Sequence, residues 1–465
     1  MTADTVVTMS TKQRALDELA ARFGVQLTVS AAVRDQHGVD ESWHPSIPPD
    51  AVLFAESTED VSAAVKICAE YDLPVIAFGT GTSLEGHIAA LRGGLCIDLS
   101  RMTELVELNV EDLDVTVLAG MTRLTLNDRI KRHGLFFPID PGADASLGGM
   151  ASTRASGTNA VRYGTMRENV LALTVVLADG RVIKTASRAR KSSAGYDLTR
   201  LFVGSEGTLG IITEVTLRLQ GLPEAISSAT CAFPSIAQAV DTVIQVIQSG
   251  TPIARVELLD ETQVRASNAF SGLTLPEKPH LFFEFHGTPA SVAEQAEYVA
   301  SVAAAHSAEG FEWASAAEDR TRLWQARHDA YYAALALTPG AKGWPTDVCV
   351  PISRLAECLL ETKADLDASF VTSTIVGHVG DGNFHVLFVL EPGNIAQQEE
   401  AARLNLLMVR RALALGGTCT GEHGVGYGKK ELLVEEHGEA LDVMRMIKTA
   451  LDPQGILNPG KVIDV

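Results

Sequence analysis

Two histidines separated by six residues limit the folding of this chain more than any other feature of its sequence. His378 and His385 enclose the run His-Val-Gly-Asp-Gly-Asn-Phe-His. In an extended chain the seven steps between them would hold the imidazoles about 23 Å apart, too far to meet at one ion. Residues 380–383, Gly-Asp-Gly-Asn, permit a turn, because Gly tolerates positive φ and Asp and Asn hydrogen-bond their own turn backbone. We therefore expect the chain to fold back here.

A second short motif, Gly-Glu-His-Gly at residues 421–424, supplies a carboxylate. Two imidazoles and one carboxylate suit a first-row divalent ion and leave coordination positions open for a substrate. His378, His385 and Glu422 are therefore the predicted ligands of a zinc, manganese or iron ion, with His423 beside it. Without the second motif, histidines held in the core would be the simpler interpretation of the run.

Composition limits the class of protein. At 465 residues the chain exceeds one ordinary core, so we expect two domains. It has no apolar run long enough for a transmembrane helix and no basic segment before an apolar one at its start. Its six cysteines are widely spaced and its net charge is −20, which indicates a reducing compartment and disfavours nucleic acid. We expect a cytoplasmic protein, with peripheral attachment to the inner face of a membrane left open.

The first half alternates strands with glycine-rich segments. A helix is expected at residues 11–23, and a strand–helix–strand unit from residue 51 ends at the first glycine-rich segment, residues 79–86. Two more follow, at 140–164 and 204–210, with a hairpin between them at 170–185. Each alone reads as a loop. Three glycine-rich segments, each next to a strand, indicate that backbone amides are brought close to a large polyphosphate ligand. The spacing fits neither the Rossmann motif nor the P-loop.

Taken together, these motifs and the C-terminal Asn-Pro-Gly-Lys at 458–461 carry a family likeness. From residue 45 to 465 the chain resembles the FAD-dependent D-2-hydroxyacid dehydrogenases of the vanillyl-alcohol oxidase / p-cresol methylhydroxylase superfamily. Residues 323–328 and 346–353 are most similar to the D-lactate dehydrogenases that pass electrons to cytochrome or quinone. The flavin subunit of bacterial glycolate oxidase is similar too.

The resemblance implies an α+β fold in two main domains. Residues 1–44 would form an N-terminal helix and loop, 45–222 an FAD-binding domain, and 223–465 a substrate and metal domain with an antiparallel sheet. The tail 452–465 would return to the flavin. The implied FAD-binding residues are Thr80, Gly81, Thr82 and Ser83 at the pyrophosphate; Pro141, Ser146, Gly149, Ser156 and Asn159 along the isoalloxazine and ribityl chain; Glu206, Gly207 and Ile212 at the adenine half; and Asn458.

The chain departs from some relatives where those relatives attach FAD covalently. Their Arg-Ser-Gly-Gly-His segment reads Gly-Thr-Gly-Thr-Ser at residues 79–83. We therefore expect non-covalent FAD, although His87 lies close by in sequence.

The implied reaction is oxidation of a D-2-hydroxy acid, D-lactate first among them, to the 2-oxo acid. A divalent ion held by the three ligands would lower the pKa of the substrate hydroxyl. His423 would then take the hydroxyl proton, or else orient Glu422. Arg327 would bind the carboxylate through its planar fork, unless it is a solvated helix residue. Asn383 would hydrogen-bond the acid, or only hold the turn.

Several alternatives remain at this stage. Electrons would pass to a cytochrome, a quinone or an electron-transfer flavoprotein, and a homodimer is left open. The substrate would instead be glycolate or D-2-hydroxyglutarate if the chain is a glycolate oxidase flavin subunit or a D-2-hydroxyglutarate dehydrogenase. Other classes are a metallohydrolase, which leaves the glycine-rich segments unexplained, and a non-catalytic flavin scaffold or electron-transfer subunit.

Overall fold

The fold is described from a computed structural model that covers residues 3–465, with side chains from Thr11 onward. It divides into two compact units. Unit 1 contains the described residues up to Ala155, then Thr165–Leu222 and Glu422–Val465, and unit 2 contains Ser156–Gly164 and Pro223–Gly421. The change of unit at residue 222 coincides with the expected boundary. Two segments differ from it, because residues 156–164 cluster with unit 2 and the return to unit 1 begins at Glu422, well before residue 452.

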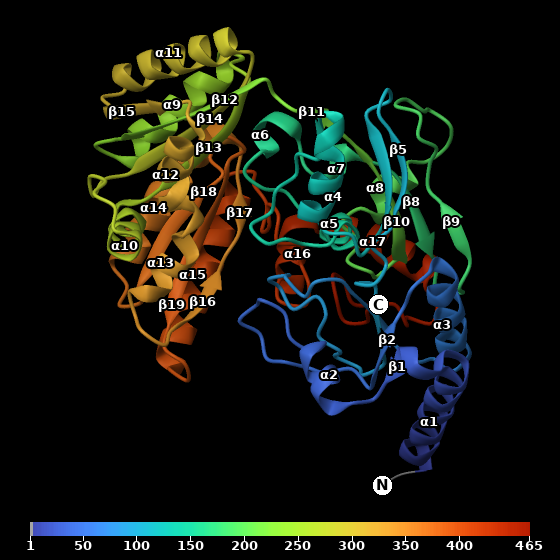
Figure 1. The fold of residues 1–465 in the computed structure, drawn as a ribbon. Helices are drawn as coiled ribbons and strands as arrows, with labels where there is room; N and C mark the ends of the chain where they lie inside the picture. Colours follow the sequence, from blue (N-terminus) through green and yellow to red (C-terminus); the bar gives the residue numbers. More distant parts are fainter. Residues whose placement is uncertain (1–2) are drawn as a thin grey trace. The chain divides into compact units, whose positions relative to one another are not determined.

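A small, mainly parallel sheet begins unit 1 (Figure 1). Its strand order is β1-β2-β4-β3, with β2 and β3 both parallel to β4. Helix α3 connects β2 to β3, and Ser57 caps it by accepting a hydrogen bond from the Asp60 N–H. The expected strand–helix–strand unit is therefore confirmed. The elements are α1 (Ala3–Phe23), β1 (Leu27–Thr28), α2 (Ala31–Gln36), β2 (Ala51–Phe54), α3 (Thr58–Glu70), β3 (Val75–Phe78) and β4 (Leu95–Asp98).

A five-stranded antiparallel sheet, in the order β5-β6-β10-β8-β9, completes unit 1 with short helices. The predicted hairpin is confirmed, since Val176 of β8 pairs with Val182 of β9. The elements are β5 (Leu105–Asn109), β6 (Asp114–Leu118), α4 (Arg123–Ile130), β7 (Leu135–Phe136), α5 (Leu147–Thr153), α7 (Met166–Asn169), β8 (Val170–Val176), β9 (Val182–Lys184), α8 (Leu198–Phe202), β10 (Ile211–Arg218) and β11 (Gln220–Gly221).

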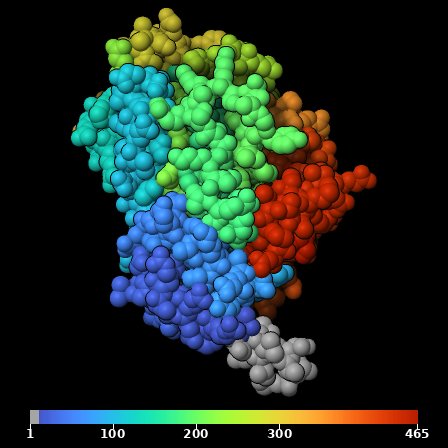
Figure 2. Space-filling view, turned by 90° about the vertical axis from the view of Figure 1, so that its right-hand side faces the viewer, coloured from blue at the N-terminus to red at the C-terminus, as the bar shows by residue number. Residues whose placement is uncertain are grey.

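The C-terminal segment packs back onto the first sheet of unit 1. It contains α16 (Lys430–His437) and α17 (Ala440–Leu451). Beyond α17, Leu457 forms a parallel bridge with Val75 of β3, and Lys448 Nζ donates a buried hydrogen bond of 2.7 Å to the Thr208 carbonyl. On one face of the molecule the C-terminal residues (red) accordingly lie beside N-terminal residues (blue) (Figure 2).

Unit 2 is built on one large antiparallel sheet, drawn from light green to orange in Figure 1. Its order is β15-β12-β14-β13-β18-β19-β16, and β17 also pairs with β19. The strands are β12 (Ala225–Ala232), β13 (Ile253–Leu259), β14 (His280–Gly287), β15 (Glu309–Ala314), β16 (Lys342–Pro345), β17 (Val348–Cys349), β18 (Ser373–Gly377) and β19 (Asn383–Leu390). The combination of this sheet with the helices and the three sheets of unit 1 is the expected α+β fold.

One group of helices in unit 2 covers the sheet face that matters for the site. Leu259 of β13 and Phe282 of β14 are buried against Trp324 of α12. Since side chains alternate along a strand, Arg255 and Glu257 face the same way as Leu259. The helices of this unit are α6 (Ala160–Tyr163), α9 (Ile236–Gln248), α10 (Glu261–Ser271), α11 (Pro289–Ala305), α12 (Ala317–His328), α13 (Ala330–Ala336), α14 (Leu355–Asp367) and α15 (Ile395–Ala414). Within residues 3–465 no helix is both long and apolar enough to cross a bilayer.

Candidate active site

The two histidines of the Gly-Asp-Gly-Asn run meet because the chain reverses between β18 and β19. These strands pair antiparallel with Val376 opposite His385, and the Asp381 N–H donates to the His378 carbonyl at 3.0 Å. Gly382 has φ +77°, and a Cβ there would overlap the Val350 carbonyl oxygen, so the turn requires glycine. The imidazole centroids lie 5.3 Å apart. The predicted reversal is confirmed.

Glu422 joins the two histidines in a cluster of metal-binding character. One ligand atom from each of His378, His385 and Glu422 lies within 4.8 Å of the others. Glu422 directly follows Gly421, the last residue of unit 2. Two imidazole nitrogens and a carboxylate oxygen around one point are a donor set for a divalent first-row ion.

Hydrogen bonds behind the histidines orient both rings. His385 Nδ1 lies 2.9 Å from the Thr346 carbonyl oxygen, which only accepts, so Nδ1 carries the proton and Nε2 the lone pair. His378 Nδ1 lies 2.7 Å from Glu257 Oε1. It likewise carries the proton and donates it to this carboxylate. Each ring therefore presents Nε2 as the ligand atom, an arrangement typical of protein metal sites. The residues present fit a divalent ion.

Glu257, which the sequence interpretation missed, links the histidines to Arg327. Its side chain is fully buried on β13, with Oε1 on His378 and Oε2 2.7 Å from Arg327 Nε. Burial alone would raise the pKa of Glu257, but attraction to and hydrogen bonds from His378 and the Arg327 guanidinium hold it below its usual value. The available signal was a glutamate in the mostly apolar strand Ile253–Leu259, which otherwise carries one charged residue, Arg255, since an unpaired buried charge would be costly.

Arg327 lies in the last turn of α12, on the side that faces β13. Its side chain is 19% exposed, so it is not the solvated surface arginine of the alternative interpretation. Because Glu257 engages Nε, the Nη1–Nη2 edge is the part of the guanidinium that can pair with both oxygens of a substrate carboxylate.

Asn383 and His423, the two other predicted catalytic residues, lie at the same cluster. Asn383 Nδ2 donates to Asp347 Oδ1 at 2.7 Å and to the Val348 carbonyl at 2.8 Å. Its buried Oδ1 has no hydrogen-bond partner within the described part of the chain. Asn383 thus holds the turn and also offers an acceptor. His423 Nε2 lies 3.9 Å from Glu422 Oε1, which places His423 next to the carboxylate ligand.

In unit 1 the predicted pyrophosphate loop, Thr80 to Ser83, follows β3 and meets the start of α5. Gly79 packs so closely on Ser146 that a Cβ would overlap Ser146 Oγ. Ser146 caps α5 by accepting from the Gly149 N–H at 3.3 Å. A glycine loop beside a helix start presents backbone amides to an anion, which fits the phosphates of FAD.

The remaining predicted FAD residues divide between the units. Asn159 lies in unit 2 with Ser156, and its Oδ1 accepts from Arg255 Nε at 2.8 Å. Pro141 is half-buried ahead of α5, and Ile212 lies in the core of the five-stranded sheet, beyond Gly207.

The Glu206 carboxylate is engaged by other groups of unit 1. It accepts from the Val425 N–H at 2.7 Å and the Gly426 N–H at 2.8 Å, and it lies 3.1 Å from His87 Nε2. Asn458 Nδ2 donates to the Glu206 carbonyl at 2.8 Å. Glu206 and Asn458 therefore fasten the C-terminal segment within unit 1, immediately after the Glu422–His423 pair.

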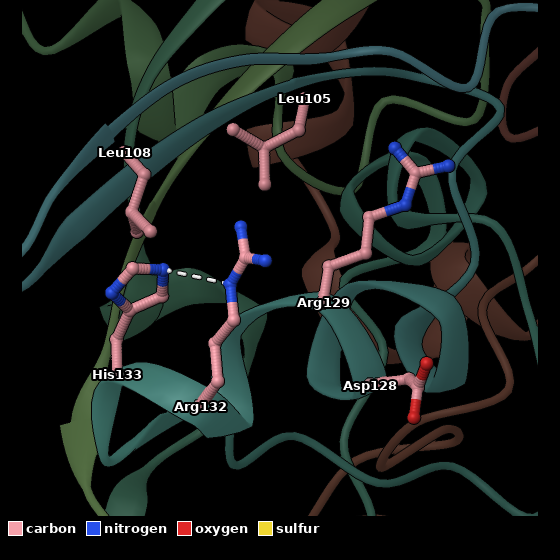
Figure 3. Close-up of a pocket in the computed structure, with 6 residues that line it drawn as sticks. All are labelled: Leu105, Leu108, Asp128, Arg129, Arg132 and His133. Atoms are coloured by element: carbon pink, nitrogen blue, oxygen red, sulfur yellow. Dashed lines mark hydrogen bonds between the residues drawn. The ribbon is translucent and has the colours of Figure 1, made fainter.

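A surface pocket in unit 1 lies apart from these residues. It is lined by Leu105, Leu108, Asp128, Arg129, Arg132 and His133, with Arg132 Nε 3.2 Å from His133 Nε2 (Figure 3). None of the predicted site residues lines it.

Family comparisons cover most of the chain. A family described as FAD linked oxidases, C-terminal domain, matches residues 222–462, and one described as FAD binding domain matches residues 49–186. A probable mitochondrial D-lactate dehydrogenase of Danio rerio is 55% identical, covering 94% of this chain and 89% of that protein. The mitochondrial D-lactate dehydrogenase (cytochrome) of Arabidopsis thaliana is 50% identical, covering 94% and 78%.

The chain belongs to the FAD-dependent D-2-hydroxyacid dehydrogenase family. It is therefore a flavoprotein oxidoreductase. The fold of this dehydrogenase agrees with solved structures. Substrate-bound p-cresol methylhydroxylase superposes with a TM-score of 0.81 at 18% identity, covering 98% of this chain and 97% of that one. The predicted fold class is confirmed.

The cytoplasmic location expected from the sequence is wrong. Both relatives at 50% identity or more are named as mitochondrial proteins. The expectation rested on widely spaced cysteines and acidic composition, and these indicate a reducing compartment without distinguishing the cytoplasm from the mitochondrial matrix.

Proposed function

We propose that this dehydrogenase oxidises D-lactate to its 2-oxo acid with FAD and a divalent metal ion, and passes the electrons to a cytochrome, a quinone or an electron-transfer flavoprotein. The observation that carries the proposal is the cluster of His378, His385 and Glu422, with donor atoms within 4.8 Å, joined through Glu257 to Arg327. Such a site offers a metal ion to the hydroxyl and a guanidinium to the carboxylate of a 2-hydroxy acid. The names of the relatives favour D-lactate and a cytochrome acceptor.

Each cofactor would supply one part of the chemistry. FAD accepts a hydride, and a divalent ion lowers the pKa of the substrate hydroxyl. The protein side chains do the rest. Arg327 binds the carboxylate through its Nη1–Nη2 edge, and Asn383 Oδ1 accepts a hydrogen bond from the substrate hydroxyl before the reaction. His423 then takes this hydroxyl proton as general base.

The charges around the site favour a monocarboxylic acid over D-2-hydroxyglutarate. Arg327 is already balanced by Glu257, and Arg255 is 3.4 Å from Glu284. A divalent ion with Glu422 keeps one positive charge, which one substrate carboxylate neutralises. Lys342 is exposed and pairs with Leu390, five residues along β19 from His385, so it is poorly placed to bind a second carboxylate. That spacing is about 17 Å. The same charge balance suits glycolate, which keeps the glycolate oxidase alternative open.

Anaerobic flavin reduction tests the proposal. Purified protein should bleach near about 450 nm on addition of D-lactate, since oxidised flavin absorbs there. Metal-depleted protein and His385→Ala should keep FAD but not bleach, because the ligand set is broken. The matched control is His306→Ala, whose Nε2 lies 2.9 Å from Gln245 Oε1, and it should bleach normally.

Three outcomes would contradict the proposal. Bleaching at the wild-type rate after metal removal would make the ion structural. No bleaching by any D-2-hydroxy acid would favour a flavin scaffold. A protein without flavin bands would favour a metallohydrolase.

A further inference from the structure

One buried carboxylate, that of Glu257, contacts both Arg327, the predicted carboxylate-binding residue, and His378, a predicted metal ligand. Glu257 has no exposed side-chain surface, and its two oxygens lie 2.7 Å from His378 Nδ1 and 2.7 Å from Arg327 Nε. These two contacts engage both of its oxygens. Its influence on the predicted substrate and ion must therefore pass through the guanidinium and the imidazole.

We propose that Glu257 is the positioning residue that sets the spacing between Arg327 and the metal ligands, and thereby selects 2-hydroxy acids over 3-hydroxy acids. The inference rests on the proposed function, because it assumes that Arg327 binds the substrate carboxylate and that the ion binds the hydroxyl.

The strand that carries Glu257 cannot shift to change this spacing. β13 is paired on both sides, with Glu257 opposite Phe282 of β14 and Leu258 opposite Gly377 of β18. A carboxylate is planar and short, so its two oxygens hold Arg327 Nε and His378 Nδ1 at one fixed distance from each other. The Nε contact also turns the Nη1–Nη2 edge of Arg327 outward from Glu257.

This fixed spacing has a consequence for substrate choice. A 3-hydroxy acid places one more carbon between its hydroxyl and its carboxylate, which lengthens the molecule by about 1.5 Å. Misplacement of that size at a reacting centre is costly, so the longer acid would reach Arg327 or the ion but not both well.

The neighbouring strand offers a matched control. Glu284 of β14 is also buried, and it likewise lies between an arginine and a histidine, 3.4 Å from Arg255 Nε and 2.8 Å from His286 Nε2. Neither of these partners is a predicted metal ligand or carboxylate binder. Glu257→Gln and Glu284→Gln thus make the same change in similar surroundings.

The first experiment titrates metal-depleted, FAD-loaded protein with Zn²⁺ and, separately, Mn²⁺, and then measures D-lactate kinetics. Glu257→Gln should weaken metal binding by about 10- to 100-fold, the usual effect of losing the partner behind a ligand histidine. It should also raise KM for D-lactate, with FAD content unchanged. Glu284→Gln should keep metal affinity and KM within about twofold of wild type. Unchanged values for Glu257→Gln, or equal losses in both variants, would overturn the inference.

A second variant keeps the test decisive if Glu257→Gln does not fold. Glu257→Asp retains the charge but shortens the side chain by one methylene. It should lower the kcat/KM ratio of D-lactate to D-3-hydroxybutyrate, and Arg327→Lys should raise KM by a smaller factor in this background than in wild type. An unchanged ratio with additive KM effects would refute the positioning role. Failure of the proposed function is distinguishable, because then wild-type flavin is not reduced by any D-2-hydroxy acid.

Discussion

At the residue scale, the site depends on buried charged and polar side chains that pair with one another. Glu257 neutralises Arg327 and orients His378, and Asn383 holds Asp347 while offering an acceptor oxygen. A buried charge without such partners would cost several kcal/mol or would lose its ionisation. With these contacts made, the Nη edge of Arg327 and Oδ1 of Asn383 are the atoms that we propose for the substrate.

Arg327→Lys should raise KM for D-lactate by about 10- to 100-fold, because charged hydrogen bonds contribute about 1.5–3 kcal/mol and an ammonium cannot serve Glu257 and a substrate fork together. Steady-state kinetics measure the change. The control is Arg322→Lys on the same helix, where the side chain is 63% exposed. Equal KM values for Arg327→Lys and wild type would return Arg327 to a structural role.

His423→Ala should retain the metal and bind substrate but lower the rate of flavin reduction by about 10² to 10⁴, the usual contribution of a general base. Part of the rate should return at high pH, where solvent base can take the proton. Stopped-flow reduction by D-lactate checks this. Loss of metal together with activity would instead indicate that His423 orients Glu422, which lies 3.9 Å away.

At the element scale, the alternation of side chains along three neighbouring strands assembles the site. Glu257 on β13, His378 directly after β18 and His385 on β19 lie on adjacent strands, with Leu258 opposite Gly377 and Val376 opposite His385. A shift of one residue in either pairing would turn these side chains to the other face. The register of the sheet is therefore a condition for the chemistry as well as for stability.

Asp260, the N-cap residue of helix α10, makes the stability of the folded protein depend on pH. It caps this helix, and its Oδ1 accepts from the Gln263 N–H at 2.8 Å and the Ile375 N–H at 3.2 Å. Burial raises the pKa of Asp260 to about 7. The folded protein therefore binds a proton that the unfolded chain releases near pH 4, and the stability contributed by Asp260 falls as pH rises from about 4 to 7.

Asp260→Asn should stabilise the protein above pH 7, because asparagine keeps the accepting oxygen and cannot ionise. Melting temperatures should differ most at pH 8, and the difference should shrink as the pH falls toward 4. Asp260→Ala, which also loses the cap, serves as the comparison and should not show this gain. Parallel melting curves for wild type and Asp260→Asn across this pH range would refute the assignment.

At the scale of the whole molecule, the chain crosses between its units more often than its motifs indicated. Residues 156–164 leave the FAD-binding half to pack in unit 2, and Glu422–Val465 returns to unit 1. Arg255 holds Asn159 in the first excursion, and Glu206 holds residues 425 and 426 in the second. Segments near the predicted cofactor and metal residues are thus anchored by hydrogen bonds within each unit.

FAD should be released when the protein is precipitated with acid, leaving the yellow colour in the supernatant. The histidine of the covalent motif is missing, and His87 is buried with Nε2 3.1 Å from Glu206 Oε2. His87→Ala should release FAD in the same way. Colour that remains with the wild-type pellet but not with the His87→Ala pellet would identify a covalent bond at His87.

The sequence alone determined the features that depend on neighbouring residues. The glycine-rich turn between His378 and His385, the hairpin at β8–β9 and the strand–helix–strand unit follow from local backbone preferences and side-chain periodicity. The sequence also predicted the three candidate metal ligands, because imidazoles and a carboxylate in glycine-rich turns are a chemical signature. The expected boundary at residue 222 rested on the Gly-Leu-Pro-Glu run at residues 221–224.

Only the tertiary structure decided which buried charges meet. Glu257 lies 70 residues from Arg327 and 121 from His378, and no local pattern relates positions so far apart. Their contact depends on which strands are neighbours and in which register they pair, and that is set by packing of the whole sheet. The contacts of Glu257 with Arg327 and His378, and those of Glu206 with residues 425 and 426, were therefore decided by the tertiary structure.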